Sequence, residues 1–169
     1  MQDLTLNDIS FLVFLFSLVA IITSGLAGFF VIRQYHTDTS FWQYKKYKKI
    51  RAQFLNEPIH GNYQLTVMAR LRKFSVLILI LMGSGQVLMY QDTPFLAVAI
   101  VSIASLVTWL CSNHLRRYRR TYWKTTPTRE FELVSDRRFK ISQFLIANIL
   151  FSLIILSISF SVFLNTQLI

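Results

Sequence analysis

The chain has 169 residues, of which 53% are hydrophobic and 15% aromatic, and its formal net charge is +10. This composition is unlike that of a soluble domain with one core. The single cysteine, Cys111, excludes an internal disulfide and a metal site built from several cysteines. We expect Cys111 to be a small buried residue near a helix end, with palmitoylation beside the membrane as the alternative.

The first apolar run, 9–32, contains no charged residue and is long enough to cross a bilayer. The residues before it are acidic rather than basic, so we expect an uncleaved span rather than a signal peptide. Within the run, Ala20, Ser24 and Gly28 recur every four residues. Small residues let a second helix approach closely in a membrane, so we predict a helix-packing face here. Simple tolerance of small residues inside a membrane is the alternative.

A polar segment, 33–73, follows and is predicted to contain a helix over 41–55, because aromatic and aliphatic residues gather on one arc. Four lysines gather on the opposite arc: Lys45, Lys46, Lys48 and Lys49. This pattern is typical of an interfacial amphipathic helix, with its aromatic side in the headgroup layer and its lysines toward anionic lipid or a partner. An ordinary solvated basic face is the alternative. After a break at Pro58 the chain can run helically from Tyr63 into the next span.

Two further apolar runs, 74–91 and 95–112, meet at a polar turn that contains Asp92. One span needs about 20 residues, so the two runs predict two spans. Lipid tolerates no unpaired backbone, and the turn is therefore expected outside the hydrocarbon. The result is a transmembrane helical hairpin. Gly83 and Gly85 in its first arm are predicted to mark close helix contacts or a bend.

The second polar segment, 113–140, is again basic and aromatic. Four of its arginines are predicted to bind anionic lipid: Arg116, Arg117, Arg119 and Arg120. The chain then runs without charge from Ile141 to its end, which predicts a fourth span over 141–164. We expect Asn148 in this span to pair with Gln86 or with a partner helix rather than to bind a substrate.

All 18 lysines and arginines lie in the two polar segments, so the positive-inside rule places both segments in the cytoplasm and both termini outside. The sequence therefore predicts an all-α integral membrane protein, with residues 1–169 forming one domain of four transmembrane helices and two basic cytoplasmic loops. A bacterial or organellar inner membrane is the expected location. The two halves also share a weak pattern of span, basic-aromatic segment and proline-containing break. Either an internal duplication or the usual composition of juxtamembrane loops explains it.

Catalytic and cofactor chemistry is not expected. The three histidines lie outside the spans without a pair at i, i+4, which disfavours a metal or haem site. The spans carry no ionisable residue of the kind that transporters use. Nucleic-acid binding is also not expected, because lipid phosphate is the anion nearest to the basic segments.

The function favoured by the sequence is that of a non-catalytic accessory or assembly subunit of a larger respiratory, photosynthetic or secretory membrane complex. Its expected partners are other membrane subunits and anionic phospholipids, with no small-molecule substrate. Small-residue faces and basic-aromatic segments with little soluble mass are the features that favour this reading. A small oligomeric transporter or channel component is the alternative.

Overall fold

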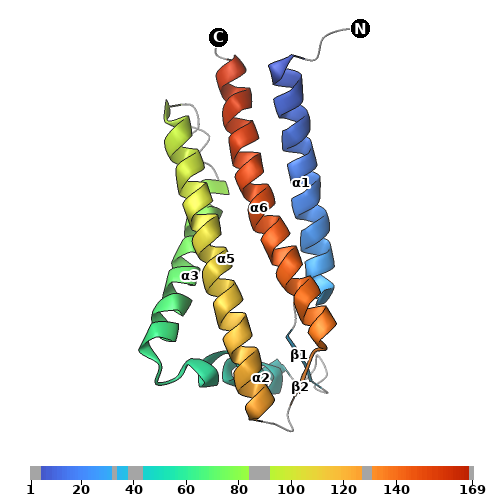
Figure 1. Ribbon diagram of the computed structural model, residues 1–169, viewed down its shortest axis with the longest axis vertical. Coiled ribbons are helices and arrows are strands. Elements are labelled where there is room, and N and C mark those ends of the chain that lie inside the picture. The colour runs from blue at the N-terminus through green and yellow to red at the C-terminus, as the bar shows by residue number, and fades with distance from the viewer. Residues whose placement is uncertain (1–4, 32–33, 38–43, 84–91, 127–130, 168–169) are drawn as a thin grey trace.

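The computed structural model is built almost entirely from α-helices (Figure 1). It describes residues 5–31, 34–37, 44–83, 92–126 and 131–167. Within these residues the helices are α1 (Leu6–Val31), α2 (Tyr44–Asn56), α3 (Tyr63–Gly83), α5 (Pro94–Thr125) and α6 (Asp136–Gln167). A 3-10 helix, η2 (Glu57–Ile59), follows α2, and two short strands are β1 (Tyr35–His36) and β2 (Glu132–Leu133).

Three of the helices, α1, α5 and α6, are long and apolar enough to cross a membrane. Helices α5 and α6 contain the predicted spans 95–112 and 141–164, and α1 contains the predicted span 9–32 except for residue 32, which is not described. The predicted span 74–91 is described only as far as Gly83, the last residue of α3. The remainder of that span, with Gly85 and Gln86, lies outside the described residues.

The long helices stand side by side in an open row, in the order α3, α5, α6, α1, and each runs antiparallel to its neighbour (Figure 1). Among the described elements, α1 packs extensively on α6 alone. No comparable contact joins α1 to α3, as it would in a closed four-helix bundle. Each helix of the row therefore keeps part of its surface uncovered by the residues that the structure describes.

Every contact along the row includes a polar side-chain pair. With the donor first, these pairs are Asn148–Ser24 (2.7 Å), Gln143–Asn113 (2.6 Å) and Thr108–Ser75 (2.7 Å). Hydrogen bonds between membrane helices contribute about 0.6 kcal/mol on average. Asn148 thus pairs with Ser24 of α1 in the same chain. Gln86, one of the two partners predicted for Asn148, lies outside the described residues.

Small side chains line the contact between α1 and α6. Ser10, Ser17 and Ser24 are buried, and their seven-residue spacing places them on one face of α1. Of the predicted small-residue face, Ser24 and Gly28 are buried and Ala20 is half-buried. These small side chains let the two helices approach closely, and Phe11 and Phe14 of α1 pack beside them on Phe163 and Phe160 of α6, at 5.9 and 5.8 Å between ring centroids.

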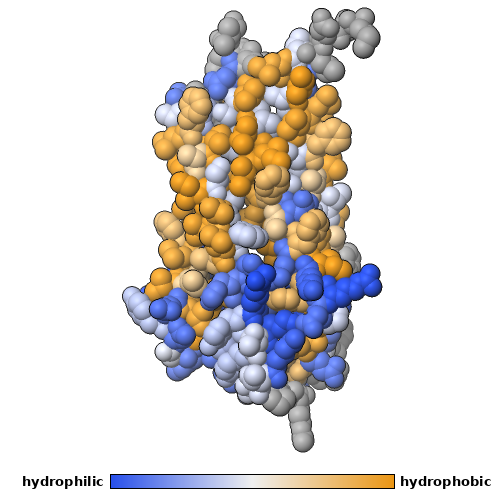
Figure 2. Space-filling view, viewed as in Figure 1, coloured by the Kyte–Doolittle hydropathy of each residue, from blue (hydrophilic) through white to orange (hydrophobic). Residues whose placement is uncertain are grey.

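The polar end of the row is a compact unit, which we call the polar base, formed by residues 34–37, 44–62, 115–126 and 131–139. Strand β1 pairs with β2 in antiparallel register, with Tyr35 opposite Leu133, and so ties the end of α1 to the start of α6. Figure 2 shows hydrophilic residues gathered at this end, below a mostly hydrophobic surface. The last turns of α5 and the first turn of α6 lie within the polar base, beyond the apolar parts of these helices.

Candidate functional site

Charged side chains gather in the polar base, and this makes it the first place to look for a site. No group of three His, Cys, Asp or Glu residues within the described ranges could hold a metal ion. Cys111, on α5, is buried and has a free thiol. The chemistry that the base offers is instead that of its lysines and arginines.

Helix α2 has one buried and one exposed side in the polar base. Ile50 and Phe54 are each only 1% exposed and pack with Trp123 and Phe131 in one apolar cluster. Phe54 stacks on Trp123 at 6.1 Å between ring centroids and meets Phe131 edge-on at 5.3 Å. The four predicted lysines are all exposed on the other side: Lys45, Lys46, Lys48 and Lys49.

The last carbonyls of α2 accept hydrogen bonds from α5. Trp123 Nε1 donates to the carbonyl oxygen of Phe54 at 3.2 Å, and Arg119 Nε donates to that of Leu55 at 3.0 Å. The last four carbonyls of any α-helix lack partners within the helix. The two donors therefore satisfy groups that the end of α2 cannot satisfy itself, and they hold it against α5.

The structure corrects the predicted placement of α2. The apolar side that was expected to face the headgroup layer packs on protein, at Ile50 and Phe54. The physical reason is that Trp123 and Phe131 offer a dry apolar surface together with a hydrogen-bond donor, which a half-hydrated headgroup layer does not. Lipid contact by the exposed lysines remains a prediction.

Arg120 holds the start of α6 against the end of α5. Its Nε and Nη2 atoms donate to Asp136 Oδ1 at 3.0 and 2.7 Å, and Nη2 also donates to the carbonyl oxygen of Val134 at 2.7 Å. The guanidinium carbon lies 4.7 Å from the ring centroid of Phe139. Hydrogen bonds from Arg120 and then from Lys124 lower the pKa of Asp136, which lies five residues before the uncharged run of α6.

Three of the four arginines predicted to bind lipid are buried in the protein. Arg116, Arg119 and Arg120 are between 3% and 8% exposed, whereas Arg117 is exposed. Arg119 and Arg120 have protein partners in place of the expected lipid headgroups. The helical period explains the division, because the three buried arginines share one face of α5 and Arg117 lies off that face.

Arg116, like Arg120 at Nη1, keeps one buried nitrogen atom without a hydrogen-bond partner among the described residues. Its Nη2 atom donates to Ser142 Oγ, but its Nε atom is buried and has no hydrogen-bond partner among the described residues. Arg72 on α3 lies near enough for its positive charge to act on Arg116 and Arg119. Burial lowers the pKa of Arg72. A buried positive charge therefore faces the gap between α5 and α6.

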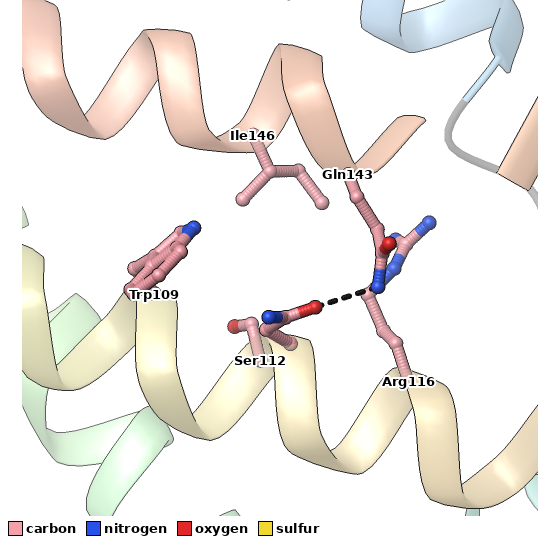
Figure 3. A pocket seen from close by; sticks show the side chains of 6 residues that line it. Trp109, Ser112, Arg116, Gln143 and Ile146 are labelled. Carbon is pink, nitrogen blue, oxygen red and sulfur yellow. Dashed lines mark hydrogen bonds between the residues drawn. The ribbon is translucent and has the colours of Figure 1, made fainter. Parts of the chain in front are cut away.

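A cavity opens in that gap beside Arg116 (Figure 3). Its lining residues come from both helices and are mostly polar: Trp109, Ser112, Asn113, Arg116, Gln143 and Ile146. A larger apolar cavity of about 320 Å³ lies further along the same two helices, with Trp109 in the walls of both. No sequence pattern within a single span predicted this pair of cavities, because their walls are formed by two helices together.

The two glycines predicted as helix-packing positions in the second span are not equally placed. Gly83 ends α3, and a side chain there would meet no described atom within 4 Å. Gly85 lies outside the described residues.

Comparisons with protein-family models, curated proteins and solved structures find no significant match to this chain. The geometry of the chain itself is thus the basis on which its function is proposed.

Proposed function

We propose that the chain is a non-catalytic accessory or assembly subunit of a larger membrane protein complex. The outward face of α1 carries this proposal. Gly25 lies on that face, and a side chain there would meet no described atom within 4 Å. Ile22 and Leu26 beside it are 52% and 64% exposed. Packing within this chain therefore does not require glycine at position 25, whereas a partner helix in close approach would.

The open row of helices supports the same proposal. A pore or a transport path needs helices that enclose it, and in the described part of the chain the two ends of the row do not meet. An accessory subunit needs no enclosed path, because its open faces receive neighbouring helices. We propose respiratory, photosynthetic or secretory complexes as the class of assembly, in a bacterial or organellar inner membrane.

In this proposal α3 belongs to a fourth span over 74–91, and the polar base lies in the cytoplasm. Two features support it: α3 runs along α5 in the row, and the start of α1 and the end of α6 lie at the end opposite the polar base (Figure 1). Single cysteines at Gln2 and Thr125, in a Cys111→Ser background, test the orientation with an impermeant thiol reagent in intact cells. Labelling at Thr125 alone would invert it.

The pair Gly25→Leu and Gly28→Leu tests the role as a subunit. Gly25 is open, so Gly25→Leu is expected to keep the fold and lose the complex on a native gel after mild detergent extraction. Gly28 is buried, and Gly28→Leu is expected to lower the unfolding temperature of the isolated chain as well. A wild-type chain that migrates as a monomer or homo-oligomer and conducts ions or solutes in liposomes would replace this proposal with a transporter or channel component.

A further inference from the structure

The gap between α5 and α6 has a charged end and an apolar end. At the charged end the Arg116 side chain extends from α5 toward α6, beside Gln143 (Figure 3). At the apolar end the walls include Leu106, Leu150 and Phe151. The exposed fractions of Leu106 and Phe151 are 54% and 63%, so the apolar end opens sideways to the surroundings of the helices. The result is an amphipathic groove.

No acidic side chain among the lining residues balances the positive charge at this end. Arg116 is only 5% exposed, its Nε atom has no partner among the described residues, and the residues lining this end include no carboxylate. A buried N–H group without a partner is unfavourable, and more so when it carries charge. Arg72 adds positive charge nearby. An anionic oxygen at this point would satisfy the donor and offset the charge.

The dimensions of the groove match one leaflet of a bilayer. Its walls run from Arg116 to Ser105 on α5 and from Gln143 to Ile154 on α6. At 1.5 Å per residue each wall is about 16 Å long, and half of the hydrocarbon core of a bilayer is about 15 Å. A chain that enters at the polar base therefore reaches the middle of the membrane.

The volumes of the two ends decide which part of a lipid fits where. The apolar cavity, at about 320 Å³, falls at the lower end of small-molecule sites. The charged end measures about 10 Å³, roughly the space of one water molecule. It accepts a single oxygen atom, and the remainder of a headgroup must lie outside it in the interfacial layer.

We infer that the α5–α6 groove binds one anionic phospholipid from the leaflet beside the polar base, with a phosphate oxygen at Arg116 and an acyl chain in the apolar cavity. The inference is independent of the proposed function, because it requires only that the chain lies in a membrane. It is also distinct from surface attraction of lipid by exposed lysines, since the groove combines a buried charge with a cavity for the chain.

Native mass spectrometry of the detergent-solubilised full chain, titrated with phosphatidylglycerol or phosphatidylcholine, tests the inference. Wild type is expected to retain one phosphatidylglycerol more strongly than phosphatidylcholine. Arg116→Gln should weaken phosphatidylglycerol binding by a factor on the order of ten or more, the value of a hydrogen bond to a charged group. Arg117→Gln removes the same charge from an exposed neighbour and should leave binding unchanged.

Ala147→Phe fills the apolar cavity while keeping every charge, and it should weaken binding of the same lipid as much as Arg116→Gln does. Helix content and unfolding temperature identify a variant that fails to fold. If Arg116→Gln does not fold, lipid binding by Ala147→Phe tests the inference alone. Equal losses for Arg116→Gln and Arg117→Gln, equal binding of the two lipids, or full binding by Ala147→Phe would each overturn the inference. Unchanged lipid binding with loss of subunit association in Ala147→Phe would assign the groove to a partner helix instead.

Discussion

Two basic helical segments of similar composition have opposite structural roles in this protein. The lysines of α2 are all exposed, whereas three of the four arginines at the polar end of α5 are buried. The guanidinium of arginine is planar and weakly hydrated and donates several hydrogen bonds in fixed directions, while a lysine ammonium is strongly hydrated. Arg119 and Arg120 use those donors on carbonyl and carboxylate oxygens of the polar base. Counting positive charge therefore predicts which end of a span is polar, but residue type and helical face decide which cations contact protein.

Of the substitutions that test this difference between α2 and α5, Trp123→Ala should lower the stability of the fold most. Trp123 is 4% exposed, contacts Phe54 and Phe131, and donates to the end of α2. Removal of a buried tryptophan side chain costs about 3–5 kcal/mol. We expect the unfolding temperature in detergent to fall and protease cleavage within α2 to rise. The control is Tyr118→Ala, because Tyr118 is exposed on the same helix.

Protease resistance of α2 in folded Trp123→Ala protein would contradict the view that the apolar cluster holds α2. A conservative variant sharpens this test. Trp123→Phe keeps an aromatic ring but loses the hydrogen bond to Phe54 and part of the buried ring, so we expect a loss of more than about 1 kcal/mol and less than that of Trp123→Ala.

Arg120→Lys should have the next largest effect, because lysine keeps the charge but cannot reproduce the geometry of the guanidinium. We expect a loss of about 2 kcal/mol, in the range for hydrogen bonds to charged groups, measured as a shift of the denaturant midpoint. The matched variant Arg117→Lys lies on the exposed side and should change stability by less than about 0.5 kcal/mol. If the two variants behave alike, the buried and exposed arginines do not differ as described.

Acidification should lower the stability of the polar base by less than the substitutions above. Asp136 has a lowered pKa in the folded chain, so its contribution is present above the unfolded pKa of about 3.9 and is lost as the pH falls through the folded value. The unfolding temperature should therefore fall between pH 5.5 and pH 3 by more in wild type than in Asp136→Asn. Identical pH dependence of the unfolding temperature in the two proteins would show that Asp136 does not stabilise the polar base.

Replacement of the four lysines of α2 by glutamine should leave stability almost unchanged, since exposed substitutions usually stay within about 0.5 kcal/mol. Its expected effect is on lipid, because each lysine near an anionic surface contributes about 1 kcal/mol. An environment-sensitive fluorophore on a cysteine at Gln53, in a Cys111→Ser background, should report a difference between nanodiscs of phosphatidylglycerol and of phosphatidylcholine that the variant lacks. A variant with the wild-type difference would show that these lysines do not contact lipid.

The apolar runs predicted α1, α5 and α6 well, because a membrane span depends on the composition of one continuous segment. The arrangement of the polar base was not predictable in the same way. Phe54 and Trp123 are far apart in the sequence, and the amphipathic pattern of α2 is the same whether lipid or protein covers its apolar side. The burial of the arginines did leave a signal, since the helix of α5 continues past its apolar run with Leu115, Arg119 and Trp123 on one face. That signal requires knowing that the helix does not end at residue 112.

The pairing of α1 with α6 sets the order of assembly during synthesis. Of the described helices, α1 is synthesised before the others and packs extensively only on α6, which is synthesised after them. Roughly 100 residues separate them, and at about 5–20 residues per second α1 waits on the order of 5–20 s for its neighbour. Throughout that interval its serine face must be tolerated by lipid or by an insertion factor. Ser10 and Ser17 donate to the carbonyl oxygens of Asn7 and Val13 within α1 itself, which favours a lone α1 span, whereas Ser24 gains its bond from Asn148 only once α6 has been made.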